Sequence, residues 1–230
     1  MSATFDLTQP QLFLDDELIE QTVRLRRVVH QPRKHFANPV YSVGAPWEGT
    51  GMVYLGGVYI DPADNLWKAW YSVDAPPAYP EIRYAVCMIV SDDGVHWRRP
   101  ELDVYKGHHG ERTNIVLDMG RSGRTAAPVI LHEPDNEAEP WVMVISVAWP
   151  AESKDYKGYI LRSPDGVHWR WLRERPNGVV HGLHDRTTAM HGPDPDFPYV
   201  LIGRGKEDNG RFNLKRVAHR IAINAERAQE

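Results

Sequence analysis

The sequence has almost no cysteine. One cysteine in 230 residues, Cys87, cannot form an internal disulfide, so the fold must depend on packing, as is usual in a reducing compartment. At 26.3 kDa the chain is long enough to bury a hydrophobic core without such a link. Because Cys87 lies in an apolar stretch, we expect its thiol to be a small core side chain rather than a nucleophile.

Basic clusters and long apolar runs are also missing. Lys and Arg number 27 against 31 Asp and Glu, and the net charge of -4 without a basic run argues against a nucleic-acid partner. No apolar run approaches the roughly 20 residues that cross a bilayer, and residues 1–16 (MSATFDLTQPQLFLDD) lack both parts of a secretory leader. Taken as given, the sequence predicts a soluble, cytoplasmic chain with no membrane partner. Secretion of a longer parent stays open.

Aromatic residues, proline and glycine are abundant. Eight Trp, 10 Tyr, 18 Pro and 18 Gly favour short strands and many turns over a helical bundle. The apolar stretches are rich in β-branched and aromatic residues and predict strands at 53–60, 66–73, 84–90, 129–131, 141–149, 159–161 and 199–202. Only the tail, residues 215–230, is ambiguous, because its apolar residues fit both helical spacing and strand alternation.

A seven-residue motif occurs twice. Residues 91–97 read SDDGVHW and residues 163–169 read SPDGVHW, identical at six of seven positions and offset by 72 residues. Two apolar stretches joined by a turn precede each copy, and a third unit starts at residues 198–202 (PYVLI). The Asp-Gly pair forms a tight turn, and we expect the Trp that follows to seal the seam between neighbouring units.

Each period holds about four strands, the unit of a β-propeller blade. The sequence therefore predicts an all-β fold: one incomplete propeller domain over residues 1–230, with blades at about 41–100, 112–172 and 179–223. Propellers close with about 4 to 8 blades, which is more than three repeats supply. Three explanations stay open: the chain is a fragment, copies associate into a homo-oligomer through open blade edges, or a terminal strand is donated to finish the last sheet.

Several segments resemble a known group of enzymes. Residues 12–16 (LFLDD), 30–32 (HQP), 38–40 (NPV) and 46–49 (PWEG), with the two SxDGxHW turns, are similar to the N-terminal half of bacterial proteins related to glycoside hydrolase families 32 and 43. The resemblance extends to about residue 199. It implies a five-bladed propeller with an active-site funnel at the axis, lined by acidic residues from the innermost strands. Those strands should begin near Glu48, Arg124 and Asp185.

Cleavage of a glycosidic bond needs one carboxyl group to protonate the leaving oxygen and a second to act as nucleophile or to activate water. We expect Glu48 and Asp185 to form this pair, on different blades. Expected substrate-binding residues are Trp47, which stacks on a sugar ring, and Arg124, His184 and Arg186. Alternatively, Glu48 caps a loop and Asp185 pairs with Arg186 on the rim. The second blade offers residues 121–125 (RSGRT) where an inner acid is expected, so the acidic set is incomplete.

No metal or other cofactor is expected. His181, His184 and Asp185 fall in a probable loop or strand, where their spacing does not place both imidazoles on one helical face.

The leading functional hypothesis is a glycoside hydrolase that cleaves an oligosaccharide with paired carboxylates. A second is a phosphate-dependent glycoside phosphorylase, because residues 38–40 and Trp47-Glu48 also resemble glycoside phosphorylases of family 130; Arg124 and Arg186 would then bind phosphate. A third is a non-catalytic sugar-binding or assembly propeller. The sequence leaves open whether the chain is an enzyme.

Overall fold

The computed structural model describes residues 19–49, 51–74, 84–120, 123–150, 153, 156–172, 180–181, 187–194, 197–206 and 212–221. The chain divides into two units, Met1–Asn38 and Pro39–Glu230. Residues 19–38, the described part of the first unit, contain no strand or helix, although the Asn38 N–H donates a 3.1 Å hydrogen bond to the His35 carbonyl in a turn. The remaining description concerns the second unit.

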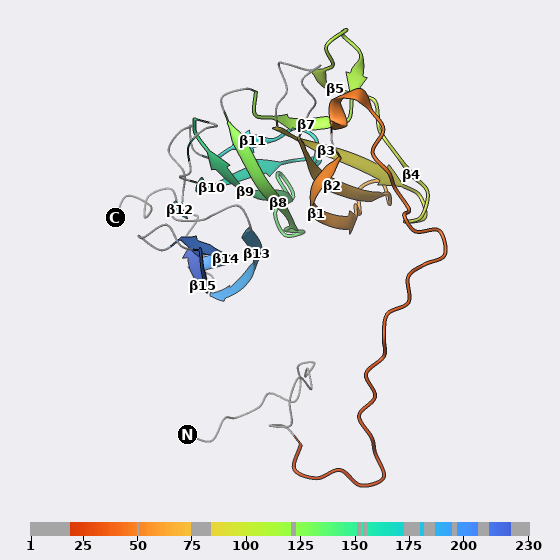
Figure 1. Cartoon of the computed structure of the whole chain (residues 1–230), viewed down its shortest axis with the longest axis vertical. Coiled ribbons are helices and arrows are strands. Elements are labelled where there is room, and N and C mark those ends of the chain that lie inside the picture. The colour runs from red at the N-terminus through yellow and green to blue at the C-terminus, as the bar shows by residue number, and fades with distance from the viewer. Residues whose placement is uncertain are drawn as a thin grey trace. The chain divides into compact units, whose positions relative to one another are not determined.

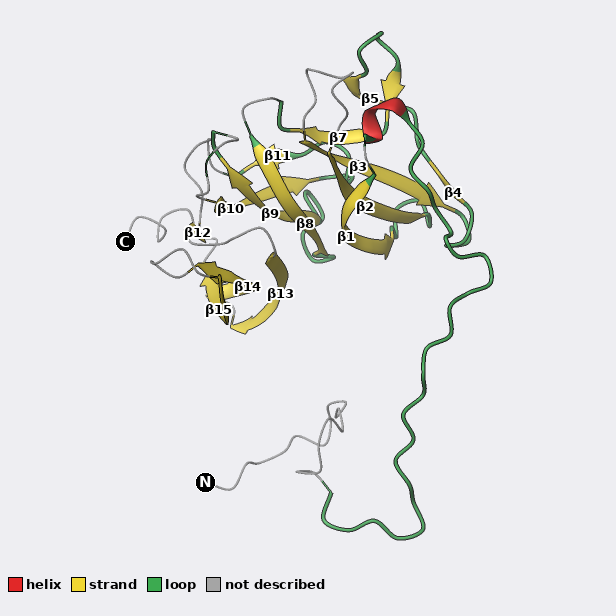
Figure 2. Ribbon diagram, viewed as in Figure 1, coloured by secondary structure: helices red, strands yellow, loops and turns green. Residues whose placement is uncertain are grey.

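The second unit is all-β, and the paired strands are antiparallel (Figure 2). Its first sheet has the order β1-β2-β3-β4, with β7 paired to β3. These strands are β1 (Met52–Ile60), β2 (Trp67–Asp74), β3 (Tyr84–Ser91), β4 (Trp97–Arg98) and β7 (Ile115–Asp118). A separate two-stranded hairpin joins β5 (Leu102–Lys106) to β6 (Arg112–Thr113). A short 3-10 helix, η1 (Pro46–Glu48), precedes β1.

The second sheet repeats the arrangement of the first. Its strands are β8 (Arg124–His132), β9 (Trp141–Ala148), β10 (Tyr156–Ser163), β11 (Arg170–Trp171) and β12 (Val180–His181), in the order β8-β9-β10-β11 with β12 on β10. The third sheet has the order β13-β14-β15, with strands β13 (Thr187–Asp194), β14 (Phe197–Lys206) and β15 (Phe212–Ile221). The predicted all-β class built from antiparallel sheets is therefore confirmed.

The seven predicted strands coincide with β1, β2, β3, β8, β9, β10 and β14, except that residues 66 and 149 fall one position outside β2 and β9. Several observed strands extend one to five residues beyond the predicted bounds. For the ambiguous tail, the structure forms strand β15 up to Ile221, and residues 222–230 lie outside the described part. The spacing between the start of β1 and the start of β8 equals the offset between the two turn motifs, so the sequence repeat is a structural repeat.

The first strands of the three sheets lie side by side. β8 contacts both β1 and β13, the first strands of the neighbouring sheets (Figure 1). We refer to these three as the inner strands. The sheets follow one another face to face, which is how the blades of a propeller are arranged.

Strand alternation places successive side chains on opposite faces of each sheet. Trp70 of β2 packs with Trp141 and Met143 of β9 between the first and second sheets. Its neighbours Ala69 and Tyr71 lie on the other face, where Tyr41, Trp47 and further side chains cover them. Val144 of β9 packs with Tyr199 and Leu201 of β14 between the second and third sheets.

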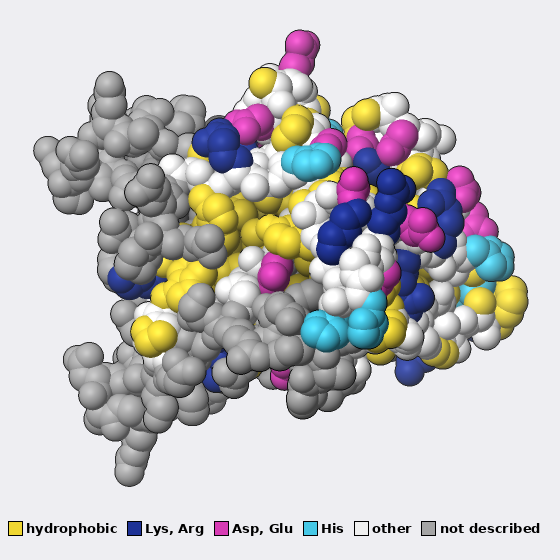
Figure 3. Space-filling model, turned by 90° about the horizontal axis from the view of Figure 1, so that it is seen from above, with side chains coloured by type: hydrophobic (Ala, Val, Ile, Leu, Met, Phe, Trp, Pro, Cys, Tyr) yellow, Lys and Arg dark blue, Asp and Glu magenta, His cyan; other side chains and the backbone are white. Residues whose placement is uncertain are grey.

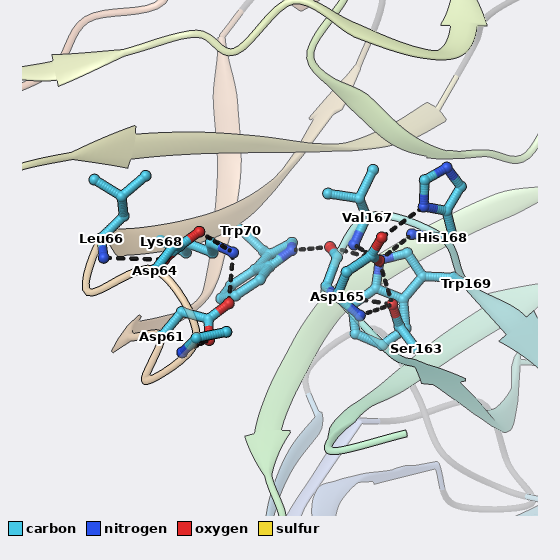
Figure 4. A network of polar contacts seen from close by, with 12 residues as sticks. Asp61, Asp64, Leu66, Lys68, Trp70, Ser163, Asp165, Val167, His168 and Trp169 are labelled. Carbon is cyan, nitrogen blue, oxygen red and sulfur yellow. Dashed lines mark hydrogen bonds and ion pairs between the residues drawn. The ribbon is translucent and has the colours of Figure 1, made fainter. Parts of the chain in front are cut away.

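The two SxDGxHW motifs fold identically as turns. In the second, Oδ1 of Asp165 accepts hydrogen bonds from the N–H groups of Val167 and His168, both at 2.8 Å, and Oγ of Ser163 accepts one from the Gly166 N–H at 2.9 Å. Figure 4 shows this network beside the turn after β1, where Lys68 contacts Asp61 at 2.5 Å. The Asp165 carboxylate accepts hydrogen bonds within its turn, and the Asp61 carboxylate forms an ion pair with Lys68, as expected of residues with a structural role.

At the seam between the first two sheets, Trp169 of the second motif packs against the core as expected, and Trp97 packs on the face of the first sheet that is turned away from the second. The indoles of Trp97 and Trp169 donate to the carbonyls of Gly94 and Gly166 within their own turns, at 3.0 and 3.1 Å. The indole hydrogen bond that crosses the seam comes instead from Trp70 of β2, whose Nε1 donates to the Gly166 oxygen at 2.8 Å. In both motifs the tryptophan indole folds back to the carbonyl of the glycine three residues earlier and so closes its own turn.

Candidate functional site

The predicted site residues lie just before, or at the start of, the inner strands. Trp47 and Glu48 precede β1, Arg124 is the first residue of β8, and the segment 184–186 directly precedes β13. His184, Asp185 and Arg186 themselves lie outside the described residues. The distance between the two predicted catalytic carboxyl groups is therefore not among the described geometry.

Glu48 is fully buried at the end of η1, and its carboxylate is saturated with donors. Oε1 accepts hydrogen bonds from the phenol groups of Tyr41 and Tyr71, and Oε2 accepts two backbone N–H bonds of 2.6 and 2.7 Å. The Arg99 guanidinium donates to both oxygens, at 3.1 and 2.8 Å. Among the described residues, its donors are Tyr41, Gly44, Ala45, Tyr71 and Arg99.

These contacts fix the charge state of the site. Burial alone would raise the pKa of Glu48, but hydrogen bonds from Arg99, Tyr71 and the two backbone amides outweigh it and hold the pKa at about 2. Burial raises the pKa of the Tyr71 and Tyr41 phenols far above the ordinary value, so both remain donors. Glu48 is thus an ionised acceptor, a state suited to a base, a nucleophile or a structural anchor, and unsuited to a general acid.

Trp47 continues the same network. Its indole donates to Oδ1 of Asn114 at 2.7 Å, and Nδ2 of Asn114 donates to the Tyr71 oxygen at 2.9 Å. Trp47 packs against the face of the first sheet that carries Tyr71, which is the face turned away from the second sheet. The network therefore fastens residues 41–48 to the first sheet.

Arg124 lies on the other side of the first sheet. Its side chain is exposed, and the guanidinium carbon lies 6.0 Å from the ring centre of Tyr84, the first residue of β3. No carboxylate within the described residues forms an ion pair with it. The structure thus brings Trp47 and Glu48 together, and separates both from Arg124 by the thickness of a sheet.

Aromatic rings surround the start of β8. The Trp149 indole lies so close to Gly123 that a Cβ there would stand 2.7 Å from Nε1, and its ring centre is 5.9 Å from that of Trp171. Tyr84, Trp149 and Trp171 are all half-buried, and they pack against the core between the first two sheets. We call the group Tyr84, Arg124, Trp149 and Trp171 the Arg124 strip. Figure 3 shows one face of the molecule, on which apolar side chains reach the surface between charged groups.

Sequence reasoning missed Tyr41, Tyr71, Arg99 and Asn114, which position Glu48 and Trp47. They come from separate segments of the chain, and no short motif links them. It also missed Tyr84 and Trp149 beside Arg124; the placement of Arg124 on an inner strand was the only available signal.

Two features are absent from the described part of the chain. No group of three His, Cys, Asp or Glu side chains there is arranged to hold a metal ion. No helix in that part of the chain is long and apolar enough to cross a membrane.

Comparison with known proteins finds similarity only among solved structures. No protein-family profile and no curated protein matches the chain. An N-acetylgalactosamine deacetylase from F. plautii, in complex with blood group B trisaccharide, is 15% identical over 72% of this chain and 47% of that one, with a TM-score of 0.41. A β-fructofuranosidase from Schwanniomyces occidentalis, complexed with fructosyl-erythritol, is 13% identical over 71% and 30%, with a TM-score of 0.49.

An α-L-arabinanase from Penicillium chrysogenum, complexed with arabinobiose, is 12% identical over 67% of this chain and 40% of that one, with a TM-score of 0.43. The chain therefore spans less than half the length of each of these three enzymes.

Proposed function

We propose that the chain is a carbohydrate-active propeller that binds a saccharide at the end of its sheets where the inner strands begin. The observation that carries this proposal is the Arg124 strip: an exposed guanidinium without a carboxylate partner among the described residues, flanked by half-buried aromatic rings. Aromatic faces pack on the apolar faces of sugar rings, and a guanidinium donates several hydrogen bonds to hydroxyl or carboxylate oxygens.

Hydrolysis of a glycosidic bond is the finer part of the proposal. Asp185 precedes β13 by two residues and would protonate the leaving oxygen, while Glu48, ionised with a pKa of about 2, would serve as nucleophile or base. For this role Glu48 must give up donors that it holds in the structure.

A non-catalytic sugar-binding protein is the second candidate. The saturation of Glu48 by tyrosine, arginine and backbone donors favours it, because a carboxylate so occupied supports a structure without needing a substrate. In this case Arg124 and the neighbouring aromatic rings would hold the saccharide without cleaving it.

Calorimetric titration and a reducing-sugar assay separate these candidates. The probes are nystose, arabinotriose and a galacturonic-acid trimer, each assayed with and without phosphate. Arg124→Ala should weaken binding at least tenfold, whereas Arg98→Ala, a control at another exposed arginine, should not. Asp185→Asn should abolish sugar release and preserve binding if the chain is a hydrolase.

The results that count against the proposal are equally defined. Equal binding by the Arg124→Ala variant and the parent removes the strip from the site. Binding of none of the three saccharides by the parent overturns the proposed function. Binding without sugar release in either buffer supports the second candidate over the first.

A further inference from the structure

Three apolar side chains on β1 are exposed. Leu55, Val58 and Ile60, here called the β1 strip, keep 56%, 40% and 49% of their surface accessible. In the β1–β2 pairing they stand opposite Tyr71, Ala69 and Trp67, so they share the face of the first sheet that is turned away from the second sheet. Tyr41 and Trp47 cover other parts of that face, but in the described structure the strip stays open.

The second sheet shows what covers this position when a neighbour is present. Ile130 of β8 is the residue of the second sheet that corresponds to Val58 in the repeat. It pairs with Met143 of β9, as Val58 pairs with Ala69 of β2. Yet Ile130 is only 1% exposed. The inner strand β1 of the preceding sheet lies over it: a Cβ on Gly57 would stand 3.2 Å from the Ile130 Cβ, and the Tyr59 hydroxyl donates to the Ile130 carbonyl at 2.7 Å.

In the third sheet, the open face is the one that is turned away from the second sheet. Tyr199 and Leu201 of β14 pack against the second sheet, so the alternate residues Val200 and Ile202 lie on the other side, with Met190 directly across from Val200. Met190 is 48% exposed, and Val200 and Ile202 are half-buried. We call these three residues the β13–β14 strip.

We propose that two copies of the chain join head to tail, the β13–β14 strip of each covering the β1 strip of the other. Within one copy, the first sheet packs on the second and the second packs on the third, each time through the face that is turned towards the next sheet along the chain. The proposed contact continues this packing from the third sheet of one copy to the first sheet of the other. Two such contacts related by a two-fold axis close a ring without leaving either strip open.

Size-exclusion chromatography with light scattering tests the proposal on the full chain. The parent should have twice the mass of 26.3 kDa over a wide range of concentrations. Ile60→Asp and Met190→Asp should each reduce the mass to that of one copy, with unchanged circular dichroism because both side chains are exposed in the single copy. Val29→Asp, at a residue 73% exposed in the first unit, is the control and should keep the double mass.

Three outcomes would overturn the proposal. One is a single-copy mass for the parent at every concentration. Another is a double mass that survives Ile60→Asp. The third is a double mass lost with Ile60→Asp but kept with Met190→Asp, since it would mean that two β1 strips meet each other. As the readout is mass alone, none of these results depends on saccharide binding.

Discussion

The indole Nε1 of Trp70 donates a 2.8 Å hydrogen bond to the carbonyl oxygen of Gly166, joining a strand of the first sheet to the turn of the second. Trp169 donates to the same oxygen from within the turn, at 3.1 Å. One carbonyl thus receives both the bond that closes its own turn and the bond that crosses the seam. Changes at either residue should separate the two contributions.

Trp70→Phe should lower the free energy of unfolding by about 2 to 3 kcal/mol, because it removes a buried hydrogen bond and leaves a void between the sheets. Trp169→Phe should lower the free energy of unfolding by about 1 kcal/mol, because the Trp169 ring is half-buried and the hydrogen bond that is lost lies within its own turn. Urea unfolding followed by circular dichroism measures both. Equal losses for the two variants would show that the seam contributes no more than the turn.

Gly166→Ala should destabilise the chain more than Gly110→Ala. Both glycines have positive φ, +76° and +80°, so alanine pays a similar backbone cost of about 1 to 2 kcal/mol at each. Only at Gly166 would the new Cβ collide with Trp70, 2.6 Å from its Cζ2; at Gly110 nothing lies within 4 Å. Thermal unfolding of the pair isolates the collision, and similar midpoints would argue against a tight seam.

Glu48→Gln should lower the free energy of unfolding by about 3 kcal/mol. The substitution leaves the Arg99 guanidinium without its counter-charge, and it turns the NH2 group of the new amide towards groups that are themselves donors. Glu139→Gln is the matched control: its partner Arg170 is exposed, so its loss should stay below about 1 kcal/mol. Chemical denaturation provides the comparison. A mild effect at Glu48 would mean that the network is dispensable and would strengthen a catalytic role for the carboxylate.

Acid should weaken the parent more than the Glu48→Gln variant. The folded-state pKa of Glu48 is lowered from 4.5 to about 2, so its contribution is complete above pH 4.5 and is lost as the pH falls towards 2. The stability difference between parent and variant should therefore shrink over that interval. Asp165, also with a pKa lowered to about 2, titrates in both proteins and cancels in the difference. A difference that is constant from pH 6 to pH 2.5 would contradict the assignment.

The strands and their repeat could be predicted because they depend on local patterns: alternating apolar residues, turn residues and a motif that recurs at a fixed offset. The partners of those strands depend on the tertiary fold. Trp169 of the second motif packs at the seam as the pattern predicts, but the indole that donates a hydrogen bond across it is that of Trp70, which no motif marks. Side-chain direction across a sheet decides this, and the sequence pattern alone does not specify which neighbour each face meets.

The candidate site was less accessible to sequence reasoning. Trp47 and Glu48 were correctly linked to the start of an inner strand, but their hydrogen-bond partners Tyr71, Arg99 and Asn114 lie 23 to 67 positions further along the chain. No local spacing reveals that Glu48 is saturated. The catalytic pairing of Glu48 with Asp185 stays a prediction.

Two adjacent glycines on β1 bring the backbones of the inner strands together: a Cβ on Gly56 would stand 2.8 Å from the Pro128 carbonyl oxygen. In the same interface, the rings of Trp149, Trp169 and Trp171 pack against the core between the two sheets. The inner strands of the first two sheets can therefore approach with no side chain of these two residues between their backbones. A larger side chain at Gly56 would collide with the Pro128 carbonyl and push β1 away from β8.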